Sequence, residues 1–262
     1  MAKKTEDTGL ATVQVGEITV PDFLMTEERD GLDNLAKHQT TPRLAIVQGQ
    51  SDPERKTQFG EGAVAIMPDG VKVAAKEEEF VAIPLVFWPT WEVWSDINDQ
   101  QSPMVTETTT DEASDIARRC KSPDTREERY GDRGEFLRRY VECLNFIFRI
   151  ETGEAKGQIA IITFNGGEHY TGAKLCGMLK RRTFSIYANR IAFKASLRTR
   201  NNRSWYGLDF NNPSDGNATV QSKEEYEALK KMHRDLADMV GASKITVSRD
   251  DAPTSAAAPV DI

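Results

Sequence analysis

A block of positive charge without any acidic side chain lies in the second half of this sequence. Between Glu168 and Asp209, forty residues carry nine lysines and arginines and no aspartate or glutamate. The whole chain has 34 basic and 41 acidic residues and a net charge of −7, so the remainder carries 34 − 9 = 25 basic residues against 41 acidic ones, or −16. Cations concentrated in this way are what the binding of a polyanion requires.

Aromatic residues are interleaved with these cations. The block contains Tyr170, Phe184, Tyr187, Phe193, Trp205 and Tyr206. In proteins that bind single-stranded nucleic acid, cations contact the phosphates and aromatic rings stack on the bases. The block therefore predicts a surface for single-stranded DNA or RNA. A solvated basic face without a ligand is the alternative.

The candidate binding residues follow from periodicity. On a predicted strand, Arg190, Lys194 and Arg198 alternate with apolar residues and so share its outward face, and Trp205 has the outward phase of the next strand. An aromatic-rich strand earlier in the chain adds two tryptophans that could stack bases. The full set of candidate nucleic-acid-binding residues is Lys174, Lys180, Arg181, Arg182, Tyr187, Arg190, Lys194, Arg198, Arg200, Arg203, Trp205, Trp91 and Trp94.

Composition limits the class of protein. With 262 residues, 39% of them hydrophobic, the chain can bury a sizeable core. No apolar run is long enough to span a membrane, and the first residues lack the apolar region of a signal peptide. Three scattered cysteines predict a reduced, cytoplasmic setting. The acidic balance predicts that contact with nucleic acid is confined to the basic block.

The first half of the chain predicts a polar arm and then short strands. Residues 1–41 show no sustained period and are expected to be mobile. A hairpin is expected to turn at Pro68-Asp69-Gly70. Residues 80–95 are rich in aromatic and β-branched residues, and two prolines within them predict a bent strand at a sheet edge. The polar residues 97–138 that follow are expected to be a long insertion.

The second half predicts four strands and two helices. Strands are expected over 140–151, 157–164, 184–199 and 203–210, with a helix over 171–182 between the second and third of these. Ser222 and Glu225 have the spacing of a capping box that begins a helix, which Gly241 ends.

The order of these elements matches a known small barrel. Three strands, a helix and two strands are the order of the OB-fold, a five-stranded Greek-key barrel that binds oligonucleotides. The expected fold is therefore mainly β with flanking helices. An OB-fold domain would occupy residues 42–241, with the insertion between its first two strands and the C-terminal helix after its last.

Five sequence segments resemble single-stranded-DNA-binding proteins encoded by tailed phages. They are "PRLAIVQG", "IPLVFWPTWEVW", "IITFNGGEHYTGAKLCGMLKRR", "WYGLDF" and "EEYEALKK". The resemblance implies an OB-fold protein of phage replication or recombination, acting in the host cytoplasm. It would bind single-stranded DNA independently of sequence and without catalysis or a cofactor.

The C-terminal residues predict a second kind of contact. Residues 242–262 are low in complexity and acidic, and are expected to be disordered. Such a tail resembles the segments with which these proteins recruit replication or recombination partners. The candidate partner-binding residues are Asp250, Asp251, Asp261 and Ile262.

Two other functions remain open on the sequence. Scattered carboxylates could form the metal site of a nuclease, although no nucleophile–base pair is recognisable. Alternatively, the basic face could dock an acidic protein. Relatives in the phage group carry clustered cysteines in the insertion, whereas here only Cys120 and Cys143 lie in or near it, without a CxxC motif. No metal ligands are therefore assigned, and both the oligomeric state and whether the insertion binds a metal stay open.

Overall fold

The computed structural model describes the backbone of residues 12–15, 18–21, 41–95, 104–131, 136–200 and 202–242. The chain divides into two units, residues 1–40 and 41–262. In the first unit, β1 (Thr12–Val15) and β2 (Ile18–Pro21) form an antiparallel hairpin. Most of the N-terminal segment 1–41 and nearly all of the C-terminal segment 242–262 lie outside the described residues. The second segment includes all four candidate partner-binding residues.

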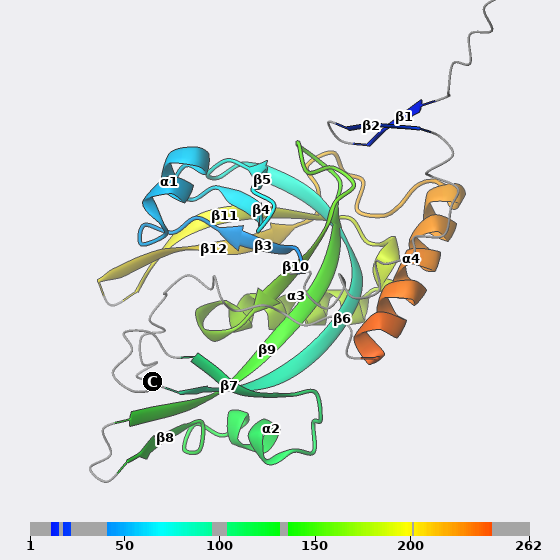
Figure 1. The fold of residues 1–262 in the computed structure, drawn as a ribbon. Coiled ribbons are helices and arrows are strands. Elements are labelled where there is room, and N and C mark those ends of the chain that lie inside the picture. Colours follow the sequence, from blue (N-terminus) through cyan, green and yellow to red (C-terminus); the bar gives the residue numbers. More distant parts are fainter. Residues whose placement is uncertain are drawn as a thin grey trace, which may run out of the picture. The chain divides into compact units, whose positions relative to one another are not determined.

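A curled mixed sheet of ten strands dominates the second unit (Figure 1). Its strand order is β12-β11-β6-β9-β10-β3-β4-β5, with β7 added to β6 and β8 added to β9. Every pairing is antiparallel except the one between β10 and β3. The protein is thus mainly β, with a sheet that curls into a half-barrel.

The bounds of the strands are β3 (Arg43–Ile46), β4 (Val64–Met67), β5 (Val71–Ala74), β6 (Glu79–Ser95), β7 (Met104–Thr109), β8 (Glu127–Tyr130), β9 (Phe136–Ile150), β10 (Ile159–Phe164), β11 (Ile191–Arg200) and β12 (Arg203–Asn211). The helices are α1 (Pro53–Phe59), α2 (Asp115–Cys120), α3 (His169–Arg181) and α4 (Lys223–Gly241). Two short 3-10 turns are η3 (Gly166–Glu168) and η4 (Ile186–Ala188).

The long strand β6 lies in the middle of the sheet, so the prediction of an edge strand was wrong for the strand as a whole. It pairs with β9 along nearly its full length. On its other side β11 pairs with residues 79–82 and β7 with residues 91–95. Pro84 and Pro89 fall between these two segments, where β9 is the only described neighbouring strand. Their missing N–H groups therefore cost no ladder hydrogen bond on that side.

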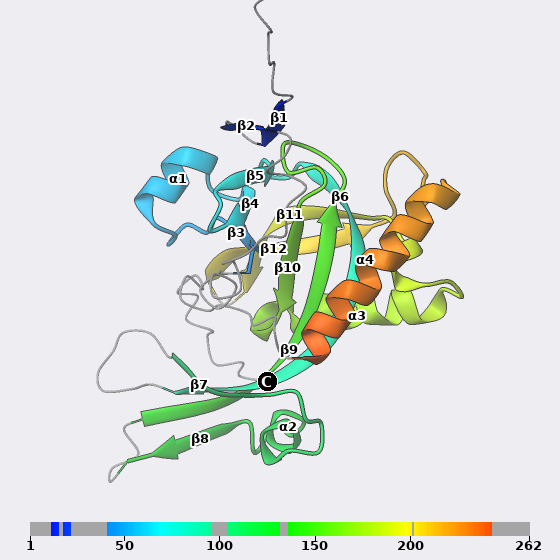
Figure 2. The ribbon, with the colours of Figure 1, turned by 45° about the vertical axis from the view of Figure 1, so that its right-hand side comes forward.

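Helix α4 covers the part of β6 that pairs with β9 alone (Figure 2). The register between β6 and β9 shifts at Leu85, and a bulged residue leaves a carbonyl outside the ladder. His233 on α4 lies with Nδ1 2.7 Å from the Leu85 carbonyl oxygen, so Nδ1–H donates to it. The predicted start of α4 is confirmed, because Ser222 is its N-cap and accepts a hydrogen bond from the Glu225 N–H at 3.4 Å. The Glu225 carboxylate pairs with Arg149, so the described bonds form only the Ser222 half of the capping box.

Inside the curl, aromatic side chains from three strands, β9, β10 and β11, form the main core. Phe146, Phe148, Phe164 and Phe193 are fully buried and contact one another through their rings. Leu175 of α3 joins the same cluster, so this helix packs into the open side of the curl. A second cluster lies on the outer face of the sheet, under α4. Both faces of the central strands are therefore covered.

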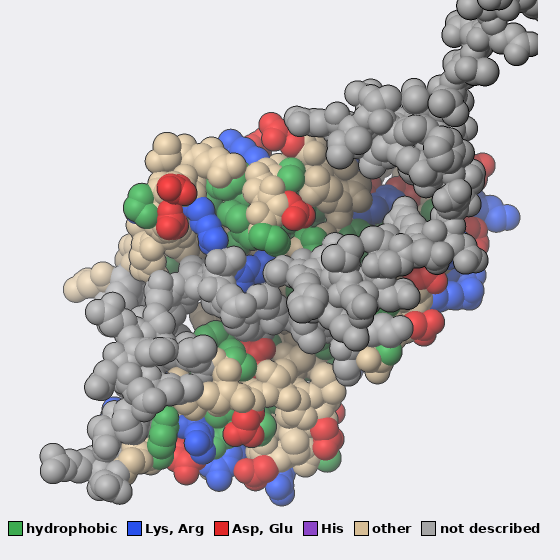
Figure 3. Space-filling model, viewed as in Figure 1, with side chains coloured by type: hydrophobic (Ala, Val, Ile, Leu, Met, Phe, Trp, Pro, Cys, Tyr) green, Lys and Arg blue, Asp and Glu red, His purple; other side chains and the backbone are tan. Residues whose placement is uncertain are grey.

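The predicted insertion contains regular structure of its own. β6 and β9 continue beyond the curl and carry β7, α2 and β8 as an arm (Figure 1). Basic and acidic side chains alternate on the visible face of this arm (Figure 3). For example, Arg119 pairs with both Asp115 and Glu128. The arm thus presents no surface of a single charge on that face.

A single glutamine links β12, at one end of the sheet, to the loop after β3. The side-chain amide of Gln48 donates to the Tyr206 carbonyl at 2.8 Å, and its oxygen accepts from the Tyr206 N–H at 2.8 Å. The amide therefore bonds to β12 as the backbone of a neighbouring strand would. This buried side chain thus joins the end strand β12 to the segment between β3 and α1.

Gln48→Ala should lower the free energy of unfolding by about 3 kcal/mol, because it leaves two buried backbone groups of Tyr206 unpaired. The measurement is urea unfolding. Gln58→Ala on the exposed side of α1 is the matched control and should change stability by less than about 0.5 kcal/mol. Equal losses in the two variants would contradict a linking role for Gln48.

Candidate nucleic-acid interface

The outward face of β11 and β12 is not a continuous basic surface. Lys194 lies directly opposite Asp209 on β12 and opposite Glu79 on β6. Cross-strand partners share one face of the sheet, so both acidic residues lie on the same face as Lys194. Lys194 is exposed, but the surface around it is of mixed charge.

Arg198 is half-buried and is bound by two carboxylates and two neutral acceptors. Its guanidinium donates to Glu168 at 2.9 Å and to Asp209 at 3.1 Å. It also donates to the Leu208 carbonyl and the Thr171 hydroxyl, at 2.9 and 3.2 Å. The sequence predicts that Arg198 faces solvent, but these four hydrogen bonds hold its guanidinium against the protein. Arg198 joins α3 to the β11–β12 hairpin.

Glu168, immediately before α3, is the centre of this network. Besides Arg198, it accepts hydrogen bonds from the Trp205 indole at 3.3 Å and from the Leu208 N–H at 3.1 Å. Burial raises the pKa of the Glu168 carboxyl, although Arg198 and the two hydrogen bonds act in the opposite direction. Gly207 is required beneath it, because a Cβ there would lie 2.3 Å from the carboxylate.

Two more of the candidate arginines stabilise the loop before α4. Arg190 donates to Asp215 at 3.0 Å and to the Asn217 carbonyl at 2.9 Å. Arg182 donates to Asn189 at 2.7 Å and to Asn212 at 2.6 Å. Burial lowers the pKa of Arg182. Both side chains already have structural partners.

The expected strand over 184–199 begins only at Ile191, because a turn comes first. The Asn189 side chain donates to the carbonyls of Ser185 and Ile186, at 3.0 and 2.8 Å, and so closes the 3-10 turn η4. This turn directs Tyr187 inward, where it is 8% exposed and packs against Tyr226 and His233 of α4. Tyr187 is a core residue in this arrangement.

The candidate tryptophans differ in exposure. Trp91 is 3% exposed, and its indole nitrogen has no hydrogen-bond partner among the described residues. Trp94 is half-buried and donates to Glu92 at 3.1 Å. Trp205 is half-buried against Gly167 and bonded to Glu168. None of the three presents a fully open ring.

The exposed cations of the block are concentrated on helix α3. Lys174, Lys180 and Arg181 are exposed and have no ion pair within the described part of the chain. The ammonium of Lys174 lies 4.3 Å from the centre of the Tyr170 ring, in a cation–π contact. The side chains of Arg200 and Arg203, at the hairpin tip, are outside the description.

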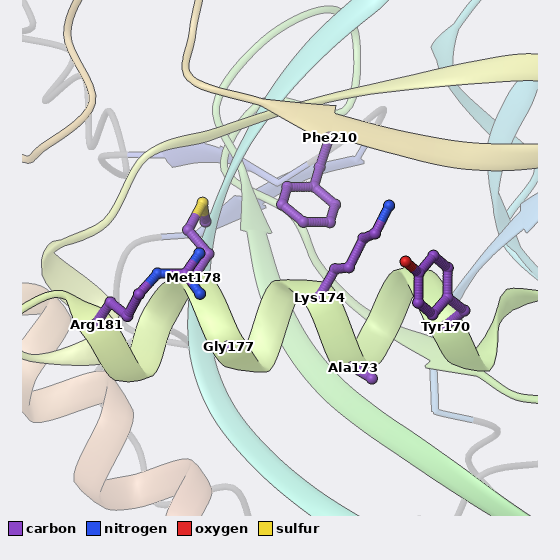
Figure 4. A pocket seen from close by; sticks show the side chains of 7 residues that line it. All are labelled: Tyr170, Ala173, Lys174, Gly177, Met178, Arg181 and Phe210. Atoms are coloured by element: carbon purple, nitrogen blue, oxygen red, sulfur yellow. The ribbon is translucent and has the colours of Figure 1, made fainter.

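A groove of about 570 Å³ lies between α3 and β12 (Figure 4). Phe210 of β12 points toward the helix, between Lys174 and Met178, while Tyr170 and Arg181 stand at opposite ends. The lining residues are Tyr170, Ala173, Lys174, Gly177, Met178, Arg181 and Phe210. The lining therefore combines two cations with aromatic and aliphatic side chains and includes no carboxylate.

Sequence reasoning missed the apolar part of this groove. The sequence places Phe210 on the inward face of its strand and so predicts a core residue. Nothing in the sequence marks Met178 as more than one position of a helix. The available signal was the spacing of Tyr170, Lys174, Met178 and Arg181, which repeats at four, four and three residues and so follows one side of a helix.

A separate polar pair lies where α3 begins. His169 Nε2 is 3.0 Å from the Glu142 carboxylate. This contact lowers the pKa of Glu142, with Lys121 adding to the effect. Burial and the charge of Glu142 raise the pKa of Cys176 to about 11, so this thiol is a poor nucleophile. Within the described residues, no three His, Cys, Asp or Glu side chains are arranged to hold a metal ion.

Comparison with known proteins adds a family to this geometry. The model of the Pam3 phage gp34-like proteins matches residues 11–240. The chain belongs to this phage protein family. No curated protein and no solved structure gives a significant match. In this gp34-like chain the match covers the whole curled sheet, the arm formed by β7, α2 and β8, and nearly all of α4. No described helix combines the length and the apolar character that a bilayer-spanning segment needs.

Arg198→Met should destabilise the protein by about 3 kcal/mol at pH 8, because it leaves the charge of Glu168 without its guanidinium partner. The folded-state pKa of Glu168 is already raised, and losing Arg198 raises it further. The protonated carboxyl is therefore favoured in the folded state. The stability of the variant declines as pH rises from the unfolded-state pKa of Glu168 through its folded-state pKa.

The loss in Arg198→Met, measured by urea unfolding, should accordingly be small near pH 4 and grow toward pH 8. Arg190→Met is the matched control, because the carboxylate of its partner Asp215 is much more exposed than that of Glu168. A loss independent of pH would show that Arg198 acts through packing and not through Glu168.

Proposed function

We propose that this protein binds single-stranded DNA in phage replication or recombination, independently of sequence and without catalysis. The observation that carries the proposal is the exposed side of α3. There, Lys174, Lys180 and Arg181 have no described ion pair, and the adjoining groove has no acidic lining. The other candidate arginines with described side chains already have acceptors within the protein.

The arrangement of the sheet supports an OB-type core for this function. Numbered as the five predicted strands, β6, β9, β10, β11 and β12 lie in the order five-four-one-two-three. The first strand thus pairs with both the second and the fourth, as a Greek-key barrel requires, and α3 lies between the third and fourth. The sheet extension β3–β5 and the arm would be additions to that core.

The rival occupant of the basic side of α3 is an acidic protein. Both ligands would be attracted by the same cations, but only a nucleic acid has a regular phosphate charge along its length. Salt-dependent binding of an oligonucleotide therefore favours a nucleic acid over an acidic protein, and a preference for single strands over duplex favours our proposal. The acidic C-terminal residues Asp250, Asp251 and Asp261 would recruit replication or recombination proteins separately.

The triple substitution Lys174→Ala, Lys180→Ala and Arg181→Ala tests the proposal. If all three cations displace counterions from a single strand, the slope of log K against log salt should become less steep by about 2. Affinity at low salt should fall with it. Fluorescence anisotropy of a labelled thymidine oligonucleotide at several salt concentrations gives both quantities.

A matched triple variant on α4 removes the same number of lysines and arginines from exposed positions, namely Lys223→Ala, Lys231→Ala and Arg234→Ala. It should leave the slope nearly unchanged. Equal effects of the two variants would mean that only the net charge matters. Equal wild-type affinity for single strand and duplex would refute the proposed function.

A further inference from the structure

One side of α3 has an unusual composition for a helix surface beside solvent. The residues that face the groove are Tyr170, Lys174, Gly177, Met178 and Arg181. Tyr170 is 68% exposed, although Lys174 lies over its ring. A cation covers one face of an aromatic ring and leaves the opposite face open to a second flat group. The exposed ring is thus held in place with a stacking face available.

Gly177 has no role in packing that would explain it. A glycine within a helix costs about 1 kcal/mol relative to alanine. A Cβ at this position would meet only the end of the Arg181 side chain, at 3.7 Å, which is ordinary contact. At Gly172, by contrast, a Cβ would lie 2.6 Å from Phe164, so close packing requires that glycine. What Gly177 does is leave the floor of the groove open.

The charge of the groove limits what can occupy it. Lys174 and Arg181 are seven residues apart on α3, or two helical turns, about 10 Å along the axis. Between them the lining is Gly177, Met178 and the edge of Phe210, all without charge. An occupant that fits is flat and apolar at its centre and negative on its flanks. An unstacked nucleobase with its neighbouring phosphates has this pattern.

We infer that the groove between α3 and β12 takes one unstacked base of the bound strand. Phe210 contacts the base, Gly177 makes room for it, and Lys174 and Arg181 contact the flanking phosphates. Tyr170 stacks on the neighbouring base with the ring face opposite Lys174. This inference rests on the proposed function and deepens it: recognition requires a base that can leave the stack, not phosphate charge alone. A base paired within a duplex meets this requirement only after it is unpaired.

The test compares Gly177→Leu with wild type on two oligonucleotides. One is a thymidine oligonucleotide, and the other has the same length and phosphates but abasic sugars throughout. Leucine is a good helix former, and its Cβ would meet only the end of the Arg181 side chain, so the variant should unfold at a temperature no lower than wild type. It keeps every cation of α3. Gly177→Ala serves as the conservative control.

Gly177→Leu should bind the thymidine strand about 10-fold more weakly than wild type, because stacking of one base is lost. On the abasic strand the two proteins should bind equally. Tyr170→Leu should give the same pattern, and Gly177→Ala a smaller change on the thymidine strand only.

Two results overturn the inference without touching the proposed function. One is a Gly177→Leu variant that binds both strands as well as wild type does. The other is one that is weakened equally on both, which would indicate a contact with phosphates. If wild type binds neither oligonucleotide at low salt, the proposed function fails and the inference fails with it.

Discussion

A carboxylate withdrawn from water at the start of α3 decides how the helix meets the sheet. An ionised side chain that is largely buried must be paired and hydrogen-bonded, because burial alone favours its neutral form. Glu168 meets this requirement with groups from both strands of the β11–β12 hairpin, Arg198 on one and Trp205 and Leu208 on the other. A helix tied in this way has a fixed position beside β12. The groove in front of Phe210 depends on that position.

The same network separates two populations among the cations of the basic block. The carboxylates nearest to the block in sequence, Glu168 before it and Asp209 after it, are the two that bind Arg198. The block therefore lacks acidic residues along the chain but not in space. Arg190 finds its carboxylate, Asp215, just beyond the block as well. The cations of the block that have no described acidic partner lie mainly on α3. Their side chains are on the exposed side of the helix, away from these contacts.

Local patterns predicted the elements but not their neighbours. Alternation in β9, in β12 and in the first part of β11, the N-cap of α4 and the turn at Pro68-Asp69-Gly70 depend on residues close in sequence, and the structure has each of them. The place of β6 depends on which strands lie beside it, and its prolines are explained only once β7 and β11 are known to stop short of them. The partners of Arg198 and the burial of Tyr187 are likewise set by distant segments. The candidate site could be predicted as a basic region, but not as one side of one helix.

The layering of the fold explains why the proposed binding groove involves a helix. The central strands bury their inner face in an aromatic core and their outer face under α4, where His233 also satisfies the bulged carbonyl of Leu85. A sheet covered on both faces has no flat surface left for a strand of nucleic acid at its centre. An open boundary within the described residues is the seam where α3 meets β12, because the helix and the strand are joined there by side chains and not by a backbone ladder. A seam built from side chains can include a glycine and an exposed tyrosine without breaking any strand pairing. It is therefore the part of this fold where a binding groove can form without disrupting the sheet.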